Sequence, residues 1–552
     1  MDLLQIIRKS KNFKSFVNKK KIKIVLISNI SVHIFKNFIE YELKKSQINS
    51  EVKIANFDNL VQESENFKNY DVVILFFELL NFYHNVNNKK KKLSSNTLNR
   101  FQQDLKLCFK ILKNTPLVLL NKFSNKIINE FRIIEKQKKI ESKINKLIEK
   151  LASKNFHFLE TSLILEKVGI KNSIDKNNFI KTRTLYSTKF MYEYAKLIKP
   201  SIMSLCGKQK KAIILDCDNT LWGGILGEDK KKIHIGSHST KGKIFYEIQK
   251  ILKDLKKRGL ILCICSKNNF REVENLFKKN KMPLSFKDFT IKKINWNNKV
   301  DNIKDISKEL NIGYESLLFI DDSAFEIGLI KKYLNKVDCF KVSENFKDYL
   351  LNIKILSNSF YFGSLTKEDE LRSKSYEHEK KRSLAKKKHS NIDDYIKSLN
   401  IKVFYDQGKK ISISRASQLC QRTNQFNLTT KRYDEKQIKK MSKDRKFFIS
   451  TISVKDDYGE YGITGLAIVK LNYQSKSAEI DTFLMSCRII GRGIEKTFMN
   501  WIIKKIKKKN FYNLRSYYKK TEKNILVKNF YEQNNFKIIS NLKIQKNYQL
   551  KL

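Results

Sequence analysis

Short apolar runs alternate with lysine-rich segments of helix length through the first two hundred residues of this chain. The runs are IKIVLIS from Ile22, EVKIANF from Glu51, DVVILFF from Asp71, PLVLLN from Pro116 and FHFLE from Phe156. Apolar runs of this length are typical of strands buried on both faces of a sheet. Strands that alternate with helices form parallel sheets covered by helices, so the pattern predicts an α/β fold.

The length of the chain predicts several domains. At 552 residues with 41% apolar content it exceeds the size at which one hydrophobic core keeps growing. We expect three α/β domains, at residues 1–205, 206–360 and 361–552. Lys199–Lys211 is predicted to be a linker, and the charged segment Thr366–Lys388 a connecting surface helix. For the third domain we expect strands near Ile401, Phe447, Gly465 and Glu479, a strand before Lys519, and helices after Gly493 and Asn524.

The charge of the chain is strongly positive but evenly spread. Lys and Arg number 112 against 56 Asp and Glu, a formal net charge of +56. Basic residues occur in every segment and no nucleic-acid-binding module is recognisable, so we do not expect a nucleic-acid partner. A diffuse positive field would still attract an acidic partner or a phosphorylated substrate.

Cysteine usage and hydropathy indicate a cytoplasmic enzyme. The eight cysteines form no C-x-x-C pair and most lie inside apolar runs, which favours reduced thiols. The longest apolar runs, such as Val72–Phe77, have the length of a strand rather than of a membrane span. The N-terminus lacks a signal-peptide cleavage pattern, so we expect no membrane association.

Two aspartates one residue apart follow an apolar run in AIILDCDNTLWGGILGED. Asp216 and Asp218 would emerge at the carboxyl edge of a central strand, where open α/β sheets bind their ligands. Carboxylates this close are tolerated chiefly when a cation lies between them, and magnesium prefers such oxygen ligands. A helix cap or a turn would explain one of these acids, but not both.

Three later segments carry matching polar groups at or near strand ends. LILCICSKNN carries Ser266, Lys267 and Asn268 after its apolar run, INWNNK places Lys299 before a helix, and SLLFIDD ends with Asp321 and Asp322. Hydroxyl and ammonium groups suit phosphate oxygens, and a second acid pair suits a magnesium ion. The residues by themselves therefore indicate a magnesium-dependent phosphatase.

In this order the motifs resemble the haloacid dehalogenase (HAD) superfamily of aspartate-dependent phosphotransferases. The resemblance implies that Asp216 is the nucleophile and that Asp218 is the general acid and base. Thr220, Ser266 and Lys299 would form the phosphate-binding set, with Thr220 also orienting Asp216. The implied magnesium ligands are Asp216, Asp218, Asp321 and Asp322. The stretch Leu221–Thr240 is too short for a separate lid domain, so we expect a minimal cap and an open cleft.

A closer resemblance is to the FkbH-like proteins of HAD subfamily IIIC, from about Ala212 to the C-terminus. It depends on LDCDNTLWGGILGED, CSKNN, INWNNK, NIGYESLLFIDD, QRTNQFNLTT and DTFLMSCRIIGRGIE. It implies removal of phosphate from 1,3-bisphosphoglycerate and delivery of the three-carbon glyceryl unit to an acyl carrier protein. Ser323 and Ala324 replace the Asn-Pro of the family, and Cys217 replaces its Leu.

The C-terminal segment contains the pattern R-x-x-G-x-G at Arg488, Gly491, Arg492 and Gly493. A glycine-rich helix start can cradle a pyrophosphate, although such a loop alone is weak evidence. With NILVKNFYEQNNF it resembles the GNAT acyltransferases, which implies contacts from Asn524 and a general acid at Tyr531, or else a packed aromatic there. The cofactor would be coenzyme A or the phosphopantetheine of a carrier protein.

Three further features complete the site prediction. Cys487 and Cys265 are candidate thioester carriers by position alone, although buried thiols are usually inert. The amide-rich loop Gln421–Thr430 is expected to face a substrate. The N-terminal domain resembles an SGNH-like domain but lacks its Gly-Asp-Ser block, so we expect it to serve as a scaffold or partner-binding domain rather than a catalytic one.

Three functions remain open at this point. The first is an acyl-loading enzyme that combines dephosphorylation with transfer to a carrier thiol. The second is a phosphatase with a fused acetyltransferase that acts on a sugar or glycan precursor. The third is a basic scaffold whose sites are relics.

Overall fold

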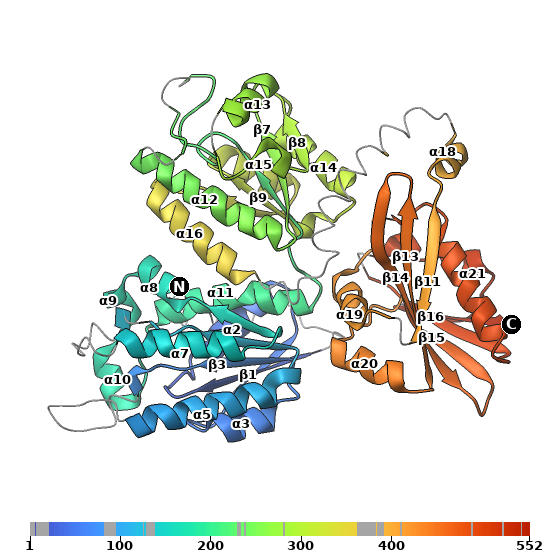
Figure 1. The fold of residues 1–552 in the computed structure, drawn as a ribbon, viewed down its shortest axis with the longest axis horizontal. Coiled ribbons are helices and arrows are strands. Elements are labelled where there is room, and N and C mark those ends of the chain that lie inside the picture. The colour runs from blue at the N-terminus through green and yellow to red at the C-terminus, as the bar shows by residue number, and fades with distance from the viewer. Residues whose placement is uncertain are drawn as a thin grey trace. The chain divides into compact units, whose positions relative to one another are not determined.

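The computed structural model describes residues 21–81, 95–124, 126–127, 138–228, 233–236, 239–279, 282–360, 391–408, 411–486, 489–521, 524–542 and 544–552, together with Ile6 and Arg382. The chain forms two compact units (Figure 1). The first combines Met1–Gln209 with Ser343–Ser364, and the second combines Lys210–Val342 with Leu365–Leu552. The segment Thr366–Lys388, predicted to be a surface helix, lies outside the described residues except for Arg382, which is buried.

The first unit contains a parallel sheet with the strand order β2-β1-β3-β4-β5. Its strands match the predicted apolar runs and are β1 (Ile22–Ser28), β2 (Ser50–Ile54), β3 (Val72–Phe76), β4 (Leu117–Asn121) and β5 (Phe156–Leu159). Successive residues of a strand point to opposite faces, so Ile24 and Leu26 join one core while Val25 and Ile27 join the other. Both faces are therefore covered by helices, as the runs predicted.

The helices of the first unit are divided between these two cores. One core holds α2 (Phe35–Lys45), α8 (Thr161–Val168) and α11 (Thr188–Leu205). The other holds α3 (Leu60–Phe67), α5 (Ser95–Ile111) and α7 (Lys138–Leu151). Three more helices are α9 (Ile170–Ser173), α10 (Lys176–Thr182) and α16 (Phe346–Ser359).

The predicted linker at Lys199–Lys211 is wrong in its first half. Helix α11 continues through Pro200 and ends at Leu205. Proline removes one helical hydrogen bond, but Leu197, Ile198 and Ile202 on the same helix are buried in the core and hold it together. Helix α16 belongs to this unit because Ser201 donates a hydrogen bond to the carbonyl of Ser359, at 3.0 Å.

The second unit begins with another parallel sheet, in the order β10-β9-β6-β7-β8. Its strands are β6 (Ala212–Leu215), β7 (Ile261–Ser266), β8 (Ile291–Ile294), β9 (Leu317–Asp321) and β10 (Asp338–Lys341). The helices between them are α12 (Thr240–Lys257), α13 (Phe270–Lys279), α14 (Lys299–Leu310) and α15 (Ala324–Tyr333). The strand order reverses at β6, and open α/β sheets bind ligands at the carboxyl ends of the strands beside such a point.

The third sheet is mixed, in the order β11-β13-β14-β15-β16-β18-β17 with β12 paired to β15. Its strands are β11 (Lys402–Gln407), β12 (Phe426–Asn427), β13 (Phe447–Asp456), β14 (Gly459–Asn472), β15 (Ser477–Met485), β16 (Asn513–Lys519), β17 (Lys537–Asn541) and β18 (Gln545–Lys551). One face packs on α19 (Ile413–Arg422) and α20 (Glu435–Lys443), and the other on α21 (Ile494–Lys507), as Figure 1 shows. Helix α18 (Ile392–Ser398) precedes β11.

The helix predicted after Asn524 is wrong. Only two short 3-10 turns occur there, at Ile525–Val527 and Glu532–Asn534. Val527 and Tyr531 turn into the core, and Asn535 adopts a left-handed conformation with φ of 66°, which ends the second turn. The α/β class with parallel sheets is confirmed.

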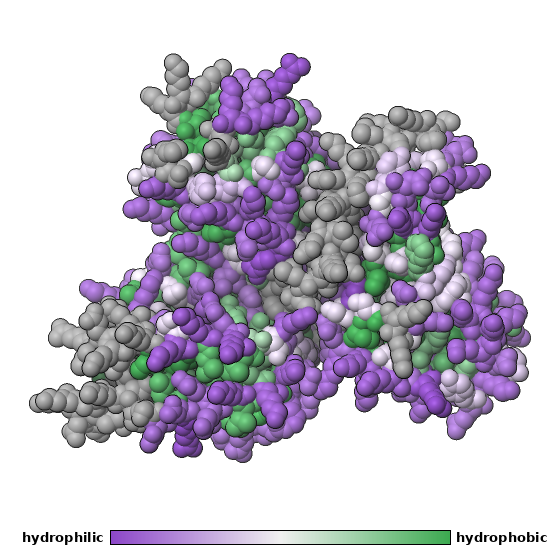
Figure 2. All heavy atoms as spheres, viewed as in Figure 1, coloured by the Kyte–Doolittle hydropathy of each residue, from purple (hydrophilic) through white to green (hydrophobic). Residues whose placement is uncertain are grey.

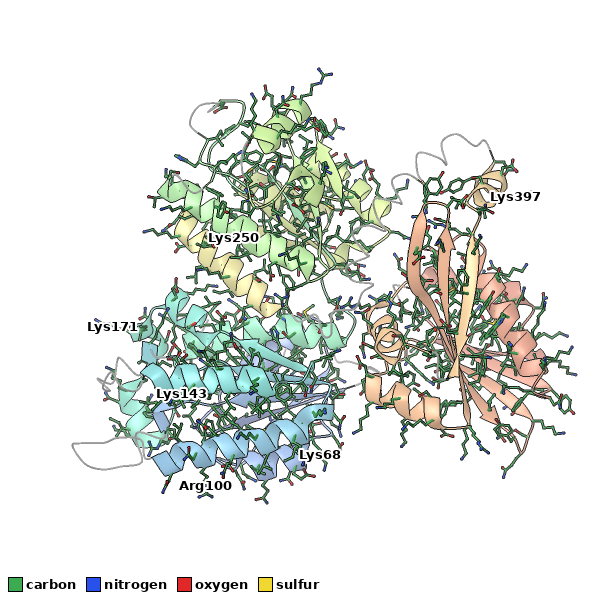
Figure 3. All side chains as sticks on the ribbon, in the orientation of Figure 1. Lys68, Arg100, Lys143, Lys171, Lys250 and Lys397 are labelled. Atoms are coloured by element: carbon green, nitrogen blue, oxygen red, sulfur yellow. The ribbon has the colours of Figure 1, made fainter. Side chains whose placement is uncertain are left out.

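Charged side chains lie on the outer surfaces of both units. Hydrophilic residues predominate on the face shown in Figure 2. Basic side chains extend outward from several elements of each unit, among them Lys143, Lys250 and Lys397 (Figure 3). Among the described residues, no helix has both the length and the apolar content needed to cross a membrane.

Candidate active site

Three carboxylates meet at the carboxyl edge of the second parallel sheet. Asp216 follows β6, Asp321 is the last residue of β9, and Asp322 comes next. One oxygen from each lies within 4.8 Å of the others. Asp216 and Asp321 are buried, so the three charges are close together in a region with little water to screen them.

Lys299 supplies the positive charge beside these acids. It begins α14, whose first turn is capped by the side chain of Asn298. Its Nζ lies 2.7 Å from Oδ2 of Asp321 and 3.2 Å from Oδ1 of Asp216. Burial alone would lower the pKa of Lys299, but the charges of Asp216 and Asp321 outweigh burial and hold that pKa well above its usual range.

The pKa of Asp321 is raised, first by burial and then by the nearby charge of Asp216, while Lys299 opposes the rise. Three carboxylates and one ammonium would leave a net negative charge in this cluster if all were ionised. Oδ1 of Asp216 is also buried and accepts no hydrogen bond of regular geometry. The donor set therefore fits a divalent cation with a preference for carboxylate oxygen, such as magnesium.

Asp218 has different partners. Its Oδ1 accepts hydrogen bonds from Nε1 of Trp222 at 2.9 Å and from the main chain of Leu226 at 3.1 Å. Its Oδ2 accepts one from Nδ2 of Asn268 at 2.9 Å. Burial raises the pKa of Asp218, which suits a carboxyl group that has to donate a proton. Among the described residues, Asp218 lies outside the carboxylate cluster of Asp216, Asp321 and Asp322, so its predicted role as a fourth metal ligand stays a prediction.

Ser266 lies at the end of β7 and is buried. Its Oγ accepts a hydrogen bond from Nδ2 of Asn268 at 3.2 Å, so Asn268 joins Ser266 to Asp218. Thr220 is fully buried, and its main-chain N–H donates to the carbonyl of Cys217. The structure thus gathers the predicted phosphate-binding residues around the same sheet edge.

Two asparagines have roles that the sequence patterns did not assign. Asn268 contacts Asp218 and Ser266, as above. Asn219 adopts a left-handed conformation with φ of 50°, and its Nδ2 donates to Oδ2 of Asp322 at 3.2 Å. Both stand within two residues of a predicted site residue, and this proximity was the one available signal in the sequence.

Of the two candidate thioester carriers, Cys265 lies within the described residues. Cys265 is fully buried in the core of the second sheet, and burial raises its pKa. Cys217 is also fully buried. Cys487 and Arg488 lie outside the described residues.

Both glycines of the glycine-rich loop adopt a left-handed conformation. Gly491 and Gly493 have φ values of 81° and 76°, and they precede α21. The main-chain N–H of Gly491 donates to Oε1 of Glu495 at 2.8 Å, so a carboxylate of the first helical turn already occupies this donor. Arg492 contacts the hydroxyl of Tyr461.

Asn524 and Tyr531 are both buried. The amide of Asn524 donates to the carbonyls of Asn427 and Lys519, each at 2.9 Å, and accepts from the main chain of Thr521. The ring of Tyr531 packs against Phe536 and Tyr548 in the core. Burial raises the pKa of Tyr531 well above its usual range.

In the first unit, side-chain amides hold the carboxyl edge of the sheet. Asn29, directly after β1, exchanges two hydrogen bonds of 2.9 Å with the main chain of Glu78. Asn121 makes the same pair of bonds with Phe77. Ser28 is buried, and its Oγ accepts a hydrogen bond from the main chain of Ile30.

The solved structures similar to this chain include one that contains a phosphatase domain. It is the N-terminal part of the protein BF1531 from Bacteroides fragilis, which contains a phosphatase domain and was crystallised in complex with Mg. The two chains share 26% identity, with a TM-score of 0.54, over 66% of this chain and 100% of the other.

Two acetyltransferases give shorter matches. The ribosomal-protein-S18-alanine N-acetyltransferase from Escherichia coli shares 10% identity over 27% of this chain and 94% of its own, with a TM-score of 0.22. A Bacillus subtilis acetyltransferase in complex with CoA shares 12% identity over 27% of this chain and 99% of its own, with a TM-score of 0.21. No family model matches the sequence, and no curated protein matches it.

Proposed function

We propose that this protein is a magnesium-dependent phosphotransferase of the HAD superfamily, in which Asp216 is the nucleophile. The observation that carries this proposal is the convergence of Asp216, Asp321 and Asp322 with Lys299 at one sheet edge. The similarity to the Mg-bound phosphatase domain of BF1531 supports it. A relic site would not be expected to retain both the acids and their buried counter-charge.

In the proposed reaction, a carboxylate oxygen of Asp216 attacks the phosphorus of the substrate in line with the leaving oxygen. The bond from phosphorus to the leaving oxygen breaks, and protonated Asp218 gives its proton to that oxygen. Asp218 then takes a proton from water, the water oxygen attacks the phosphorus, and the bond to Asp216 breaks. Bound magnesium would offset the negative charge on the transferred phosphoryl group.

Lys299 and Ser266 would stabilise the same transfer. The ammonium of Lys299 lies close enough to Asp216 to contact a phosphoryl oxygen bonded to it. Asn268 would keep Asp218 directed at the leaving oxygen, because its Nδ2 donates a hydrogen bond to Oδ2 of Asp218. Oδ1 of Asp218 accepts hydrogen bonds from Trp222 and from the main chain of Leu226.

The proposed substrate is the phosphoglyceryl donor 1,3-bisphosphoglycerate, with an acyl carrier protein as acceptor of the glyceryl group. The carrier thiol would attack the C1 carbonyl of the donor, the bond from C1 to its phosphate oxygen would break, and inorganic phosphate would leave. Asp216 would remove the phosphoryl group at C3, where the leaving oxygen becomes the hydroxyl of the glyceryl unit. This finer assignment depends on the FkbH-like motifs. Two large apolar side chains near the site are exposed, Trp296 in the loop between β8 and α14 and Phe325 in the first turn of α15. An exposed apolar rim supports a large partner rather than an enclosed small substrate.

The C-terminal sheet would bind the pantetheine arm of the carrier or of coenzyme A. The left-handed glycines at the start of α21 support this assignment. Because Oε1 of Glu495 accepts from the N–H of Gly491, we expect Glu495→Ala, which frees this donor and removes a negative charge, to bind coenzyme A more tightly than the wild type in isothermal titration. In the alternative function, a phosphatase with an acetyltransferase for a sugar or glycan precursor, the same loop would bind coenzyme A.

The test combines the protein with 1,3-bisphosphoglycerate, magnesium and an acyl carrier protein, and weighs the carrier by mass spectrometry. Carrier that gains one glyceryl group supports the acyl-loading function. Release of phosphate from sugar phosphates without any gain of carrier mass would favour the alternative. Asp216→Asn should abolish both outcomes, and a fully active Asp216→Asn variant would exclude the aspartyl-phosphate mechanism.

A further inference from the structure

A polar pocket lies in the second unit, at the edge of the parallel sheet opposite to Asp216. Its lining includes Lys211, directly before β6, and Ser316, directly before β9. Asp216 and Asp321 lie at the other ends of these strands. Lys211 and Asp216 flank the four residues of β6, and at about 3.3 Å per residue their main chains are roughly 16 Å apart. A small ligand in this pocket could not touch Asp216.

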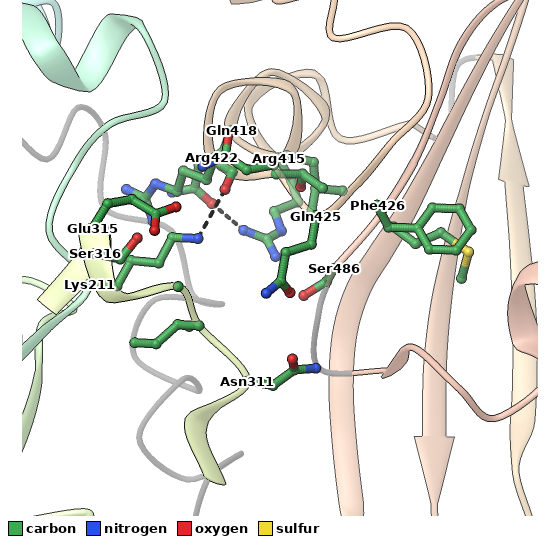
Figure 4. A pocket seen from close by; sticks show the side chains of 16 residues that line it. Lys211, Asn311, Glu315, Ser316, Arg415, Gln418, Arg422, Gln425, Phe426 and Ser486 are labelled. Atoms are coloured by element: carbon green, nitrogen blue, oxygen red, sulfur yellow. Dashed lines mark hydrogen bonds between the residues drawn. The ribbon is translucent and has the colours of Figure 1, made fainter. Parts of the chain in front are cut away.

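Further lining comes from α19 and the loop that follows it, from the turn after α14 at Asn311, and from the end of β15 beside Ser486 (Figure 4). Arg415 and Arg422 on α19 are both buried, and with Lys211 they give the pocket three cationic side chains against one carboxylate, Glu315. Figure 4 shows Lys211 directed at the carbonyl of Arg422 and the guanidinium of Arg415 directed at the side chain of Gln418. Burying cations is costly, so a buried group of this sign favours an anionic ligand.

Polar groups beside the cations indicate a ligand that also donates hydrogen bonds. Oε1 of Gln425 is buried, lines the pocket and accepts no hydrogen bond. A buried acceptor without a donor is costly, and a hydroxyl or amide group of a ligand would satisfy it. The hydroxyl of Ser486 lies on the same side of the pocket as Gln425 (Figure 4).

The lining is held in place before any ligand arrives. Nε of Arg415 donates to the carbonyl of Ile463 at 3.1 Å, and Nζ of Lys211 donates to the carbonyl of Arg422 at 3.2 Å. Arg432 donates to the carbonyl of Gln421 at 2.8 Å and to Oδ1 of Asn424 at 2.5 Å. A pocket fixed in this way loses little conformational entropy on binding.

We infer that this pocket is a second binding site, which takes a small hydroxylated anion with a carboxylate or phosphate group. The anionic group contacts Arg415, Arg422 and Lys211, and a hydroxyl of the ligand donates to Oε1 of Gln425. The site is separate from the proposed phosphotransferase site, and binding there does not require Asp216 or Lys299.

Isothermal titration of the full chain with two probes, inorganic phosphate and glycerate, tests this inference. Phosphate reports on the phosphate form of the ligand, and glycerate on the hydroxylated carboxylate form. We expect at least one probe to bind to a Lys299→Met variant, whose proposed active site has lost its phosphate contact. Binding of that probe should weaken about tenfold or more in Lys211→Met and in Arg415→Lys, because each change removes or displaces a charged donor.

Two further variants make the result decisive. Gln425→Ala alters the lining without changing a charge and should weaken glycerate more than phosphate, because the alcohol hydroxyls of glycerate lie outside its anionic group and can donate to Oε1 while that group stays on the cations. Lys250→Met removes the same charge as Lys211→Met from the exposed face of α12 and should leave binding unchanged. The inference is overturned if neither probe binds, or if binding is lost in Lys299→Met and kept in Lys211→Met and Arg415→Lys.

Discussion

Nδ2 of Asn268 donates a hydrogen bond of 2.9 Å to Oδ2 of Asp218, fifty positions away in the sequence. This contact connects the loop after β7 to the loop after β6, and it orients the carboxyl group that the proposed reaction uses as acid and base. This hydrogen bond therefore holds two loops that are distant in sequence next to each other at the proposed active site.

Replacement of Asn268 tests that contact. Asn268→Ala should lower kcat about 10- to 100-fold with little change in KM, because a misdirected Asp218 affects the proton transfer more than substrate binding. Steady-state phosphate release measures both constants. Asn269→Ala is the matched control, since Asn269 caps α13 through the main chain of Arg271 and is exposed. Equal losses in the two variants would contradict the positioning role of Asn268.

Removal of Lys299 should make the protein depend on magnesium for stability. In Lys299→Met the carboxylates of Asp216, Asp321 and Asp322 lose their buried counter-charge, and the free energy of unfolding should fall by roughly 3–5 kcal/mol in the presence of a chelator. Magnesium should restore more stability to this variant than to the wild type, because the cation then offsets more repulsion. Thermal unfolding with and without magnesium measures the difference, and an equal response of both proteins would argue against a metal site here.

The stability of the first unit should depend on pH through Glu78. Burial raises the pKa of Glu78 from 4.5 to about 7, although the hydroxyl of Tyr186 opposes the rise. The folded state therefore holds a proton that the unfolded state loses first, so this contribution is fully present below pH 4.5 and is lost as the pH rises through 7. The full change is about 3 kcal/mol.

Glu78→Gln should remove this dependence, because glutamine has no proton to lose in that range. Urea unfolding followed at pH 5 and pH 8 measures the effect on the first unit. Glu65→Gln is the control, since Glu65 is half-exposed and pairs only with Lys68 nearby. An unchanged pH dependence in Glu78→Gln would show that other groups are responsible.

The ion pair between Arg382 and Asp456 should contribute strongly to the second unit. Both side chains are buried, and the guanidinium makes two hydrogen bonds of 2.6 Å to the carboxylate. Arg382→Met should destabilise the unit by roughly 3–5 kcal/mol, since it leaves the carboxylate of Asp456 buried without its counter-charge. Arg382→Met with Asp456→Asn should recover part of the loss, because asparagine carries no charge and still accepts from the main chain of Tyr458 and Gly459. Lys455→Met, at an exposed pair with Glu460, should cost less than about 1 kcal/mol.

Much of the architecture could be predicted because strand runs are local features. The runs from Ile22, Asp71 and Pro116 became β1, β3 and β4 almost to the residue. In contrast, the predictions at Pro200 and after Asn524 failed because both depend on tertiary packing. Helix α11 survives its proline through contacts with the core, and the segment after Asn524 forms short turns because Val527 and Tyr531 have to reach the core.

The sequence by itself determined which residues stand at strand ends, and so placed Asp216, Ser266 and Asp321 at one sheet edge, because apolar runs and the polar residues that follow them are properties of the local chain. Only the tertiary structure decided which side chains lie together. Asp216 lies beside Asp321, Asp322 and Lys299, whereas Asp218 contacts Asn268 and Trp222. The pocket lined by Arg415, Arg422 and Lys211 also depends on the tertiary structure. The direction of a side chain after a strand depends on loops brought together from distant parts of the chain. No local sequence pattern determines which of these loops contact one another.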